Sequence, residues 1–351
     1  MTEPLVSVLV PTYNGERFLR PALRSALEQS HRTIEVLVGD DGSTDRTPEI
    51  LAAAAAADPR VRVIRHEENL GAFENPLALL AAARGEYVKF LLHDDVLARD
   101  CVRVLVRGME AAPEATLAFS RRTVVDVEGR PTPGGVLSPL RDRAGLWDGH
   151  ELGDACLTAG QNLIGEMTTV LYRRTAVELE DYWQVDGERL EVLGDLGLWL
   201  RLLATGPAFY SPDALSRFRV HGEQRSADHD LATRGVLDWP RLVDWAERAG
   251  FLHDPAARRA AYAGILHGCA GRVVGLGGAP GSGAALEASF LALVRLAELD
   301  RRPTDDPGPP APLAVRAHSP AELAHLRHGL HLTPDAPGSR PRPGLVDSVA
   351  S

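Results

Sequence analysis

Short apolar runs rich in Val, Ile and Leu alternate with helix-like stretches through the first hundred residues of the chain. In chain order, runs and stretches lie at 6–10, about 16–29, 34–38, about 46–57, 61–64, about 74–84 and 87–92. Continuous apolar strands separated by helices are typical of βαβ units, in which helices cover both faces of a parallel sheet. The pattern therefore predicts an α/β fold with a mainly parallel sheet.

Each predicted strand is followed by polar residues. These are PTYN at 11–14, DDGSTD at 40–45, HEENLG at 66–71 and HDD at 93–95. In open α/β sheets, ligands bind outside the carboxyl ends of the strands. The four polar segments are therefore expected to meet at one ligand-binding edge.

The rest of the chain changes character twice. Residues 115–175 mix strand-like segments with turns, 195–204 predict an amphipathic helix, and 218–222 predict a short strand. From about 231 to 300 the sequence is helical in pattern and rich in Ala and Leu, and 301–351 is rich in Pro. We expect a catalytic domain at 1–225, a helical extension at 226–300 and a largely disordered tail at 301–351.

Charge and composition exclude several classes of function. The net charge is −10 without a basic run, which disfavours a nucleic-acid partner. A stretch of about 18 apolar residues, long enough to span a membrane, is absent from the sequence. The three cysteines form no C-x-x-C pair, and the N-terminus does not resemble a signal peptide, so we expect a cytoplasmic protein.

Two pairs of carboxylates follow apolar strands, and each pair has two interpretations. Asp40 and Asp41 suit recognition of uracil N3–H and ribose hydroxyls, but they also suit a simple strand-to-helix turn. Asp94 and Asp95 suit a hard divalent cation that shares its oxygen ligands with substrate phosphates, but they also suit a solvated acidic turn.

Single residues farther along the chain are ambiguous in isolation. Asp195 is either a helix cap that stabilises the helix dipole or a general base for an acceptor hydroxyl. His221 is either a structural residue or a ligand of a metal or substrate. Glu166 in GEMTT has the same two interpretations, structural or functional.

Taken together, the segments resemble glycosyltransferase family 2, whose members have the GT-A fold. The resemblance covers roughly residues 5–225 and depends on the order of its pieces. These are VSVLVPTYNGERFLRPALRSALEQ, IEVLVGDDGSTD, NLG, LLHDDVL, a GE/TTVLYRR segment, GDLGLWLRL and FRVHG. The implied fold is a Rossmann-like, mainly parallel sheet flanked by helices, followed here by a C-terminal helical appendage.

The resemblance implies a role for each matching residue on the donor side. Pro11, Thr12 and Tyr13 would line the nucleotide pocket, and Asp41, with Asp40, would contact the base and ribose. A UDP-sugar is the implied donor, with UDP-GlcNAc as one candidate.

The implied cofactor is a divalent metal, Mg or Mn. Asp94 and Asp95 would hold it together with the diphosphate of the nucleotide, and His221 matches a histidine that approaches the metal or diphosphate in related enzymes. Many members have an acid where this chain has Leu92, so the choice of ligand between Asp94 and Asp95 stays open.

The implied reaction is a single displacement that inverts the anomeric centre. Asp195 would deprotonate the acceptor as it attacks C1, and Arg201 and Arg219 would support the phosphate or the catalytic loop. Members often have Glu-Asp at the position of the base, whereas this chain has Gly194-Asp195, which removes a supporting carboxylate.

These observations favour an enzyme that acts on a hydroxyl of a soluble acceptor, a small molecule such as an aminoglycoside or a glycan. The alternatives are a transferase for cell-wall, exopolysaccharide or lipid-linked sugars, and an inactive module that binds sugar nucleotides. A nucleotidyltransferase would need a basic Gly-rich loop after the first strand, which PTYNGERF does not match.

Overall fold

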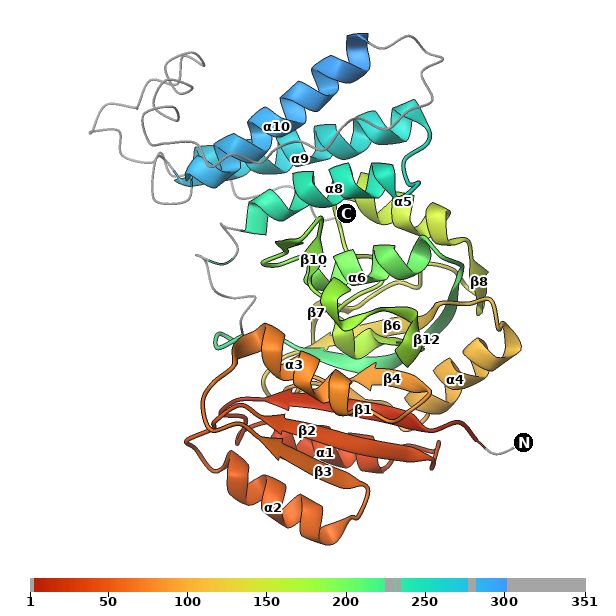
Figure 1. Cartoon of the computed structure of the whole chain (residues 1–351), viewed down its shortest axis with the longest axis vertical. Helices are drawn as coiled ribbons and strands as arrows, with labels where there is room; N and C mark the ends of the chain where they lie inside the picture. The colour runs from red at the N-terminus through yellow and green to blue at the C-terminus, as the bar shows by residue number, and fades with distance from the viewer. Residues whose placement is uncertain (1–2, 225–230, 232–234, 277–281, 302–351) are drawn as a thin grey trace.

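A mixed sheet forms the centre of the chain in the computed structural model, which describes residues 3–224, 231, 235–276 and 282–301 (Figure 1). Its strands are β1 (Val6–Thr12), β2 (Ile34–Asp40), β3 (Val61–Arg65), β4 (Tyr87–Phe90), β5 (Val96–Leu97), β6 (Leu117–Val125), β7 (Pro131–Val136), β8 (Gly145–Trp147), β9 (Val170–Arg173) and β12 (Ala208–Arg219). A separate two-stranded ribbon pairs β10 (Gln184–Val185) with β11 (Glu188–Arg189).

The helices alternate with the strands in the first half of the chain and dominate the second half. They are α1 (Leu19–Leu27), α2 (Thr47–Ala57), α3 (Gly71–Ala82), α4 (Cys101–Ala111), α5 (Gly149–Ala159), α6 (Gly194–Leu203), α8 (Asp238–Arg248), α9 (Pro255–Leu276) and α10 (Ser282–Arg301).

The order of strands confirms the predicted α/β class. The main path of the sheet runs β3-β2-β1-β4-β9-β6-β12-β5, and the four N-terminal strands are parallel to one another. Beyond β4 the sheet becomes mixed, because β9 is antiparallel to both β4 and β6, and β5 is antiparallel to β12. The carboxyl ends of β1, β2 and β4 therefore lie along one edge, as the polar strand ends predicted.

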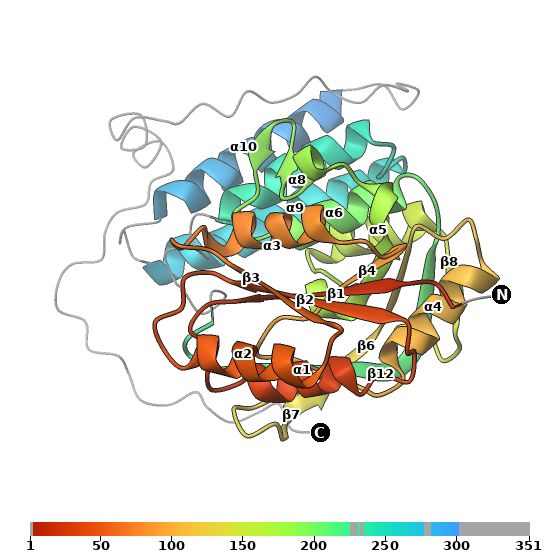
Figure 2. The same cartoon turned by 60° about the horizontal axis from the view of Figure 1, so that its bottom comes forward.

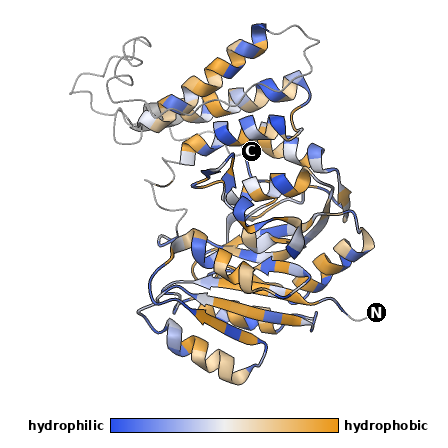
Figure 3. Cartoon of the chain, viewed as in Figure 1, coloured by the Kyte–Doolittle hydropathy of each residue, from blue (hydrophilic) through white to orange (hydrophobic). Residues whose placement is uncertain are grey.

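Alternate residues of β1 pack into two hydrophobic clusters on opposite faces of the sheet. Val8 and Val10 pack with α1 and α4, whereas Leu9 packs in the cluster that contains α3, α5 and α6. Figure 2 shows the N-terminal strands between α3 on one face and α1 and α2 on the other, and Figure 3 shows the apolar character of these strands. Burial on both faces explains why the strands are continuous apolar runs.

Two sequence-based predictions were wrong about local structure. The strand predicted at 218–222 is the end of the long strand β12, which stops at Arg219, so His221 lies beyond the strand. The helix predicted as amphipathic, α6, is buried on nearly all sides. The reason is that α6 packs against the sheet and α5 while the C-terminal helices cover its remaining face.

The C-terminal helices α8, α9 and α10 pack on one another and continue the core of the sheet domain (Figure 1). Leu242, Tyr262 and Ala288 belong to the same buried cluster as Trp199 of α6 and Phe251. The helices predicted between 231 and 300 are therefore present. The tail predicted at 301–351 lies outside the described residues, apart from Arg301. Within the described part of the chain, no helix is both long and apolar enough to cross a membrane.

Candidate functional site

The ends of β1 and β2 lie side by side and carry the first two predicted segments. Pro11 pairs with Gly39 and Thr12 pairs with Asp40 in the parallel register, and the backbone N–H of Asp41 donates to Thr12 O at 3.0 Å. These bonds hold the PTYN and DDGSTD segments as one unit at the edge of the sheet.

Asp40 is the carboxylate of this unit that retains an oxygen without a hydrogen bond. Its Oδ1 accepts from the N–H of Ser43 at 3.1 Å, while Oδ2 lacks a hydrogen-bond partner among the described residues and lies 3.4 Å from Nε of the exposed Arg65. The Oγ1 of Thr12 is likewise buried without a described partner, and Tyr13 is half exposed. These groups are suited to recognising a ligand that brings its own donors and an aromatic face.

Asp41, in contrast, is occupied by the protein backbone. Its two oxygens accept from the N–H groups of Leu70 and Gly71, both at 2.8 Å, where α3 begins. The first N–H groups of a helix have no partner within the helix, so Asp41 caps α3 from a distant loop. The structure thus places Asp41 as a cap and leaves Asp40 as the better candidate for contact with a nucleobase.

Asp95 lies in the turn between β4 and β5, directly before β5, and is fully buried. Its Oδ1 accepts from the N–H of Arg219 at 2.9 Å, and its Oδ2 accepts from the Thr168 hydroxyl at 2.6 Å. Burial raises the pKa of Asp95 well above its usual value, and the neighbouring Asp94 raises it further. Both oxygens are engaged by the chain, so Asp95 is better placed to join strand ends than to bind a metal directly.

Asp94 is also largely buried and contacts a different set of partners on the same turn. Its Oδ2 lies 3.1 Å from His221 Nε2 and 3.2 Å from Gln224 Nε2. Arg219 supports the turn from behind, because its Nε donates to the Asp94 carbonyl at 2.8 Å and its Nη1 donates to the carbonyls of Asp126 and Val127. The guanidinium of Arg219 thus joins the Asp94 turn to the turn that follows β6.

Asp94 and His221 fit a divalent metal whose remaining ligands come from a substrate. No cluster of three or more His, Cys, Asp or Glu side chains that could hold a metal occurs in the described ranges. Metals that bind nucleotide diphosphates commonly use one or two carboxylates and complete their shell with phosphate oxygens and water. One carboxylate and one imidazole at 3.1 Å match that requirement.

Thr168 and Lys89 support this edge and were not recognised as functional from the sequence. The Thr168 hydroxyl, which donates to Asp95, also accepts from the N–H of Leu92 at 3.1 Å. The fully buried ammonium of Lys89 donates to the carbonyls of Thr168 and Val170, and burial lowers the pKa of Lys89. Lys89 is the single lysine of the sequence, and its position inside the apolar run 87–92 was the available signal.

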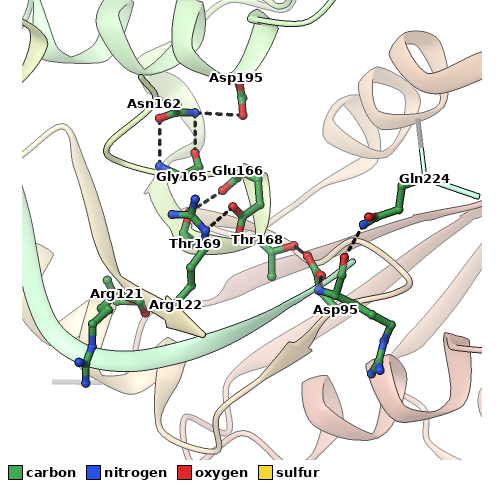
Figure 4. Close-up of polar contacts among 12 residues, drawn as sticks. Asp95, Arg121, Arg122, Asn162, Gly165, Glu166, Thr168, Thr169, Asp195 and Gln224 are labelled. Atoms are coloured by element: carbon green, nitrogen blue, oxygen red, sulfur yellow. Dashed lines mark hydrogen bonds and ion pairs between the residues drawn. The ribbon is translucent and has the colours of Figure 1, made fainter. Parts of the chain in front are cut away.

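Asp195 lies in the first turn of α6, beside Asn162 (Figure 4). Its Oδ1 accepts from the N–H of Leu196 at 2.7 Å, and its Oδ2 accepts from Asn162 Nδ2 at 3.1 Å. Burial raises the pKa of Asp195 to about 7, and the nearby charge of Glu166 contributes to the rise. A carboxylate with a pKa near the working pH has the property required of a general base.

Glu166 lies between Asp195 and Asp95, as Figure 4 shows. Its Oε2 pairs with Arg122 Nε at 2.9 Å, and its Oε1 is buried without a hydrogen-bond partner in the described residues. Burial raises the pKa of Glu166, and Arg122 opposes that rise. The residue that the sequence left ambiguous is therefore part of the electrostatic environment of Asp195.

Arg201 is not brought to this site. Its guanidinium lies 3.3 Å from Asp181, donates to the carbonyl of Gln184, and stacks over Trp245 at 5.3 Å from the ring centre. Arg201 is six residues after Asp195 on α6, so the two side chains leave different faces of the helix. The structure gives Arg201 a packing role between α6 and α8.

Comparisons with known proteins identify the family of this chain and structures that share its fold. The family described as glycosyl transferase family 2 matches residues 7–167. The "putative teichuronic acid biosynthesis glycosyltransferase TuaG" of Bacillus subtilis is 30% identical over 221 residues, which cover 62% of this chain and 80% of that protein.

Two solved structures share the fold at lower identity. S. aureus TarS 1-349 in complex with UDP-GlcNAc has a TM-score of 0.62 and 21% identity, covering 84% of this chain and 83% of that one. A mannosyltransferase from Pyrobaculum calidifontis in complex with GDP-Man and Mn²⁺ has a TM-score of 0.51 and 18% identity, covering 86% and 89% of the two chains.

The cap assigned to Asp41 predicts a stability defect. Asp41→Ala leaves the N–H groups of Leu70 and Gly71 without their acceptor, so we expect the free energy of unfolding to fall by about 0.5–2 kcal/mol in a urea titration. The exposed Glu67 of the adjoining loop supplies the control, Glu67→Ala, which should leave stability unchanged. Wild-type stability in Asp41→Ala would show that the carboxylate is not needed as a cap.

Proposed function

The chain belongs to glycosyl transferase family 2 and is a glycosyltransferase with the GT-A fold, and we propose that it transfers a sugar from a UDP-sugar to a hydroxyl of a cell-wall or other surface glycan. The observation that carries the proposal is the joint placement of Asp94 and Asp195. Asp94 lies 3.1 Å from the imidazole of His221, and Asp195 has a pKa of about 7.

The proposed reaction is a single displacement at the anomeric carbon. An acceptor oxygen forms a bond to C1 while the bond from C1 to the diphosphate oxygen breaks, and its electron pair leaves with UDP. The proton of the acceptor hydroxyl passes to Asp195, which is ionised above a pH of about 7. Attack opposite the leaving group inverts the configuration at C1.

Asp40 supports the choice of a uridine nucleotide. Its Oδ2 accepts no hydrogen bond from the described residues and is suited to the N3–H of uracil. The guanidinium of the exposed Arg65 lies 3.4 Å from this oxygen, so we expect Arg65 to move when the base binds. The structural neighbour in complex with UDP-GlcNAc makes that nucleotide sugar the first donor to test.

The proposed cofactor is Mg²⁺ or Mn²⁺ held by Asp94 and His221. When bound, the cation supplies positive charge that neutralises the diphosphate leaving group. Asp95 fixes the turn that carries Asp94 through its bonds to Thr168 and Arg219. Gln224 and His221 both contact Asp94 Oδ2. We therefore expect Gln224 to lose this contact when the cation binds.

The acceptor is proposed from the relatives rather than from the site. The name of the Bacillus subtilis relative places that protein in teichuronic acid biosynthesis, which favours a polysaccharide acceptor. The net charge of −10, which suggested a cationic natural product such as an aminoglycoside, is a weaker argument because it describes the whole chain and not the acceptor site.

If Asp195 is the general base, one substitution should lower turnover without lowering stability. Asp195→Asn should lower turnover by roughly 10²–10⁴-fold, the scale of general-base loss, while the affinity for UDP-GlcNAc persists. Wild-type turnover should rise with pH to a plateau above about 7, where Asp195 is ionised.

The melting temperature of Asp195→Asn provides the control. The fold raises the pKa of this carboxyl, so its ionisation disfavours the folded state increasingly as pH rises from the unfolded pKa, about 3.9, through the folded one. At pH 8 the neutral variant should therefore melt at or above the wild-type temperature. Unchanged turnover in this variant would reject Asp195 as the base.

The donor assignment predicts a preference among nucleotides. In calorimetric titrations with Mn²⁺ present, UDP should bind more tightly than GDP, because Asp40 accepts from the imide of uracil. Asp40→Ala should reduce that preference. Tighter binding of GDP by the wild-type protein would overturn the assignment of a uridine donor.

The metal assignment predicts that Mn²⁺ strengthens the binding of UDP through Asp94. Asp94→Asn should weaken Mn²⁺-dependent binding of UDP at least about tenfold, and His221→Ala should weaken it less because the carboxylate carries the charge. Asp142→Asn, in an exposed loop, is the matched control. Equal affinity with Mn²⁺ and with excess chelator would contradict the assignment.

A further inference from the structure

The side-chain amide of Asn162 is held in one orientation by the backbone of Gly165. Asn162 Oδ1 accepts from the N–H of Gly165 at 3.0 Å, and Nδ2 donates to the carbonyl of Gly165 at 3.0 Å. A flipped amide would place donor against donor and acceptor against acceptor. The same Nδ2 donates to Asp195 Oδ2 at 3.1 Å, so the fixed amide presents a donor to the carboxylate.

Gly165 is itself fixed relative to the helix that carries Asp195. Its φ of +105° lies in the region that favours glycine, and a Cβ at this position would lie 2.6 Å from Thr169 Oγ1. Its carbonyl accepts a second bond from the buried indole N–H of Trp199 on α6 at 2.8 Å. The loop and the first turns of α6 are therefore joined at two points, through Trp199 and through Asp195.

The residue before Asp195, Gly194, has little room for a side chain. A Cβ on Gly194 would lie 3.0 Å from the ring of Trp183, which is tighter than an ordinary contact. The second oxygen of Asp195 is instead supported from outside α6, by Asn162.

Two charged groups on other elements act on Asp195. Glu166, which follows Gly165, raises the pKa of Asp195, and Arg122 of β6 lowers it. These two groups form an ion pair at 2.9 Å, so the negative charge of Glu166 is held in a fixed place near the base. Figure 4 shows Asn162, Glu166 and Asp195 gathered around the same loop.

We propose that Asn162 is the positioning residue of the base and that the Glu166–Arg122 pair sets the charge around it. Asn162 orients Asp195 so that the carboxylate receives the proton of the acceptor, and Glu166 makes the carboxylate a stronger base. This inference rests on the proposed role of Asp195 in catalysis.

The two residues have opposite effects on the proton affinity of Asp195. The hydrogen bond from Asn162 stabilises the ionised carboxylate and lowers its pKa, whereas the charge of Glu166 destabilises it and raises its pKa. Loss of Asn162 should therefore move the titration of Asp195 to higher pH. Loss of the charge on Glu166 should move it to lower pH.

The experiment measures the carboxyl titration of Asp195 by NMR, in protein labelled with carbon-13 at the aspartate side-chain carboxyl. The signal is assigned by its absence in Asp195→Asn. We expect a midpoint near the wild-type value of about 7, a higher midpoint in Asn162→Ala and a lower one in Glu166→Gln. Gln161→Ala, at the exposed neighbouring position, should leave the midpoint unchanged.

Turnover of the same variants separates positioning from a purely structural role. With UDP-GlcNAc and Mn²⁺, UDP release by Asn162→Ala at saturating donor should fall roughly 10- to 100-fold, with the KM for UDP-GlcNAc unchanged, because the base is misplaced and the donor edge is intact. If Asn162→Ala does not fold, Asn162→Asp serves instead. It keeps the acceptor for Gly165 and should also raise the midpoint, because it adds a negative charge.

Two results identify which idea fails. Midpoints that stay at the wild-type value in both Asn162→Ala and Glu166→Gln would overturn the positioning inference, even if Asp195→Asn is inactive. Wild-type turnover in Asp195→Asn would instead reject the base assignment on which the inference rests.

Discussion

The buried carboxylate of Asp95 is the constraint around which the site is organised. A carboxyl group that is fully buried, as Asp95 is in the turn between β4 and β5, is costly to the fold unless its oxygens accept hydrogen bonds. The two bonds come from Thr168 and from the backbone of Arg219, residues 73 and 124 positions away. The hydrogen bonds of this one acid therefore link the turn between β4 and β5 to the end of β12 and to the turn that precedes β9.

This arrangement divides the edge of the sheet into two halves with different chemistry. On the donor half, the Arg219 side chain holds the Asp94 backbone, and Asp94 meets His221 within hydrogen-bonding distance. On the acceptor half, the turn that supplies Thr168 continues back through Glu166 to Gly165, which is bonded to α6. A single short segment thus links the group that would bind the diphosphate to the group that would accept the proton.

The sequence located the residues of the proposed donor half more readily than the contacts of the proposed acceptor half, for a physical reason. Strand ends in a parallel sheet meet at one edge, so polar residues after apolar runs located Asp40 and Asp94 without any contact information. The partners of Asp41 and Asp195 lie 29 to 33 residues away in loops, and their spacing carries no periodic signal. β12 was predicted too short because Ser211–Leu215 contains Pro212 and Asp213, and the register shifts there, so the alternation of apolar residues is interrupted.

We propose that one edge of the sheet holds the donor through Asp40, Asp94 and His221, and that Asp95 has a structural role. Crystals grown with UDP and MnCl₂, measured at the manganese absorption edge, test it most directly. We expect an anomalous peak for manganese within bonding distance of Asp94 and His221. Uracil should be hydrogen-bonded to Asp40, and Asp95 should still be hydrogen-bonded to Thr168. A manganese peak bound to Asp95 in place of Asp94, or a nucleotide at a different edge of the sheet, would contradict it.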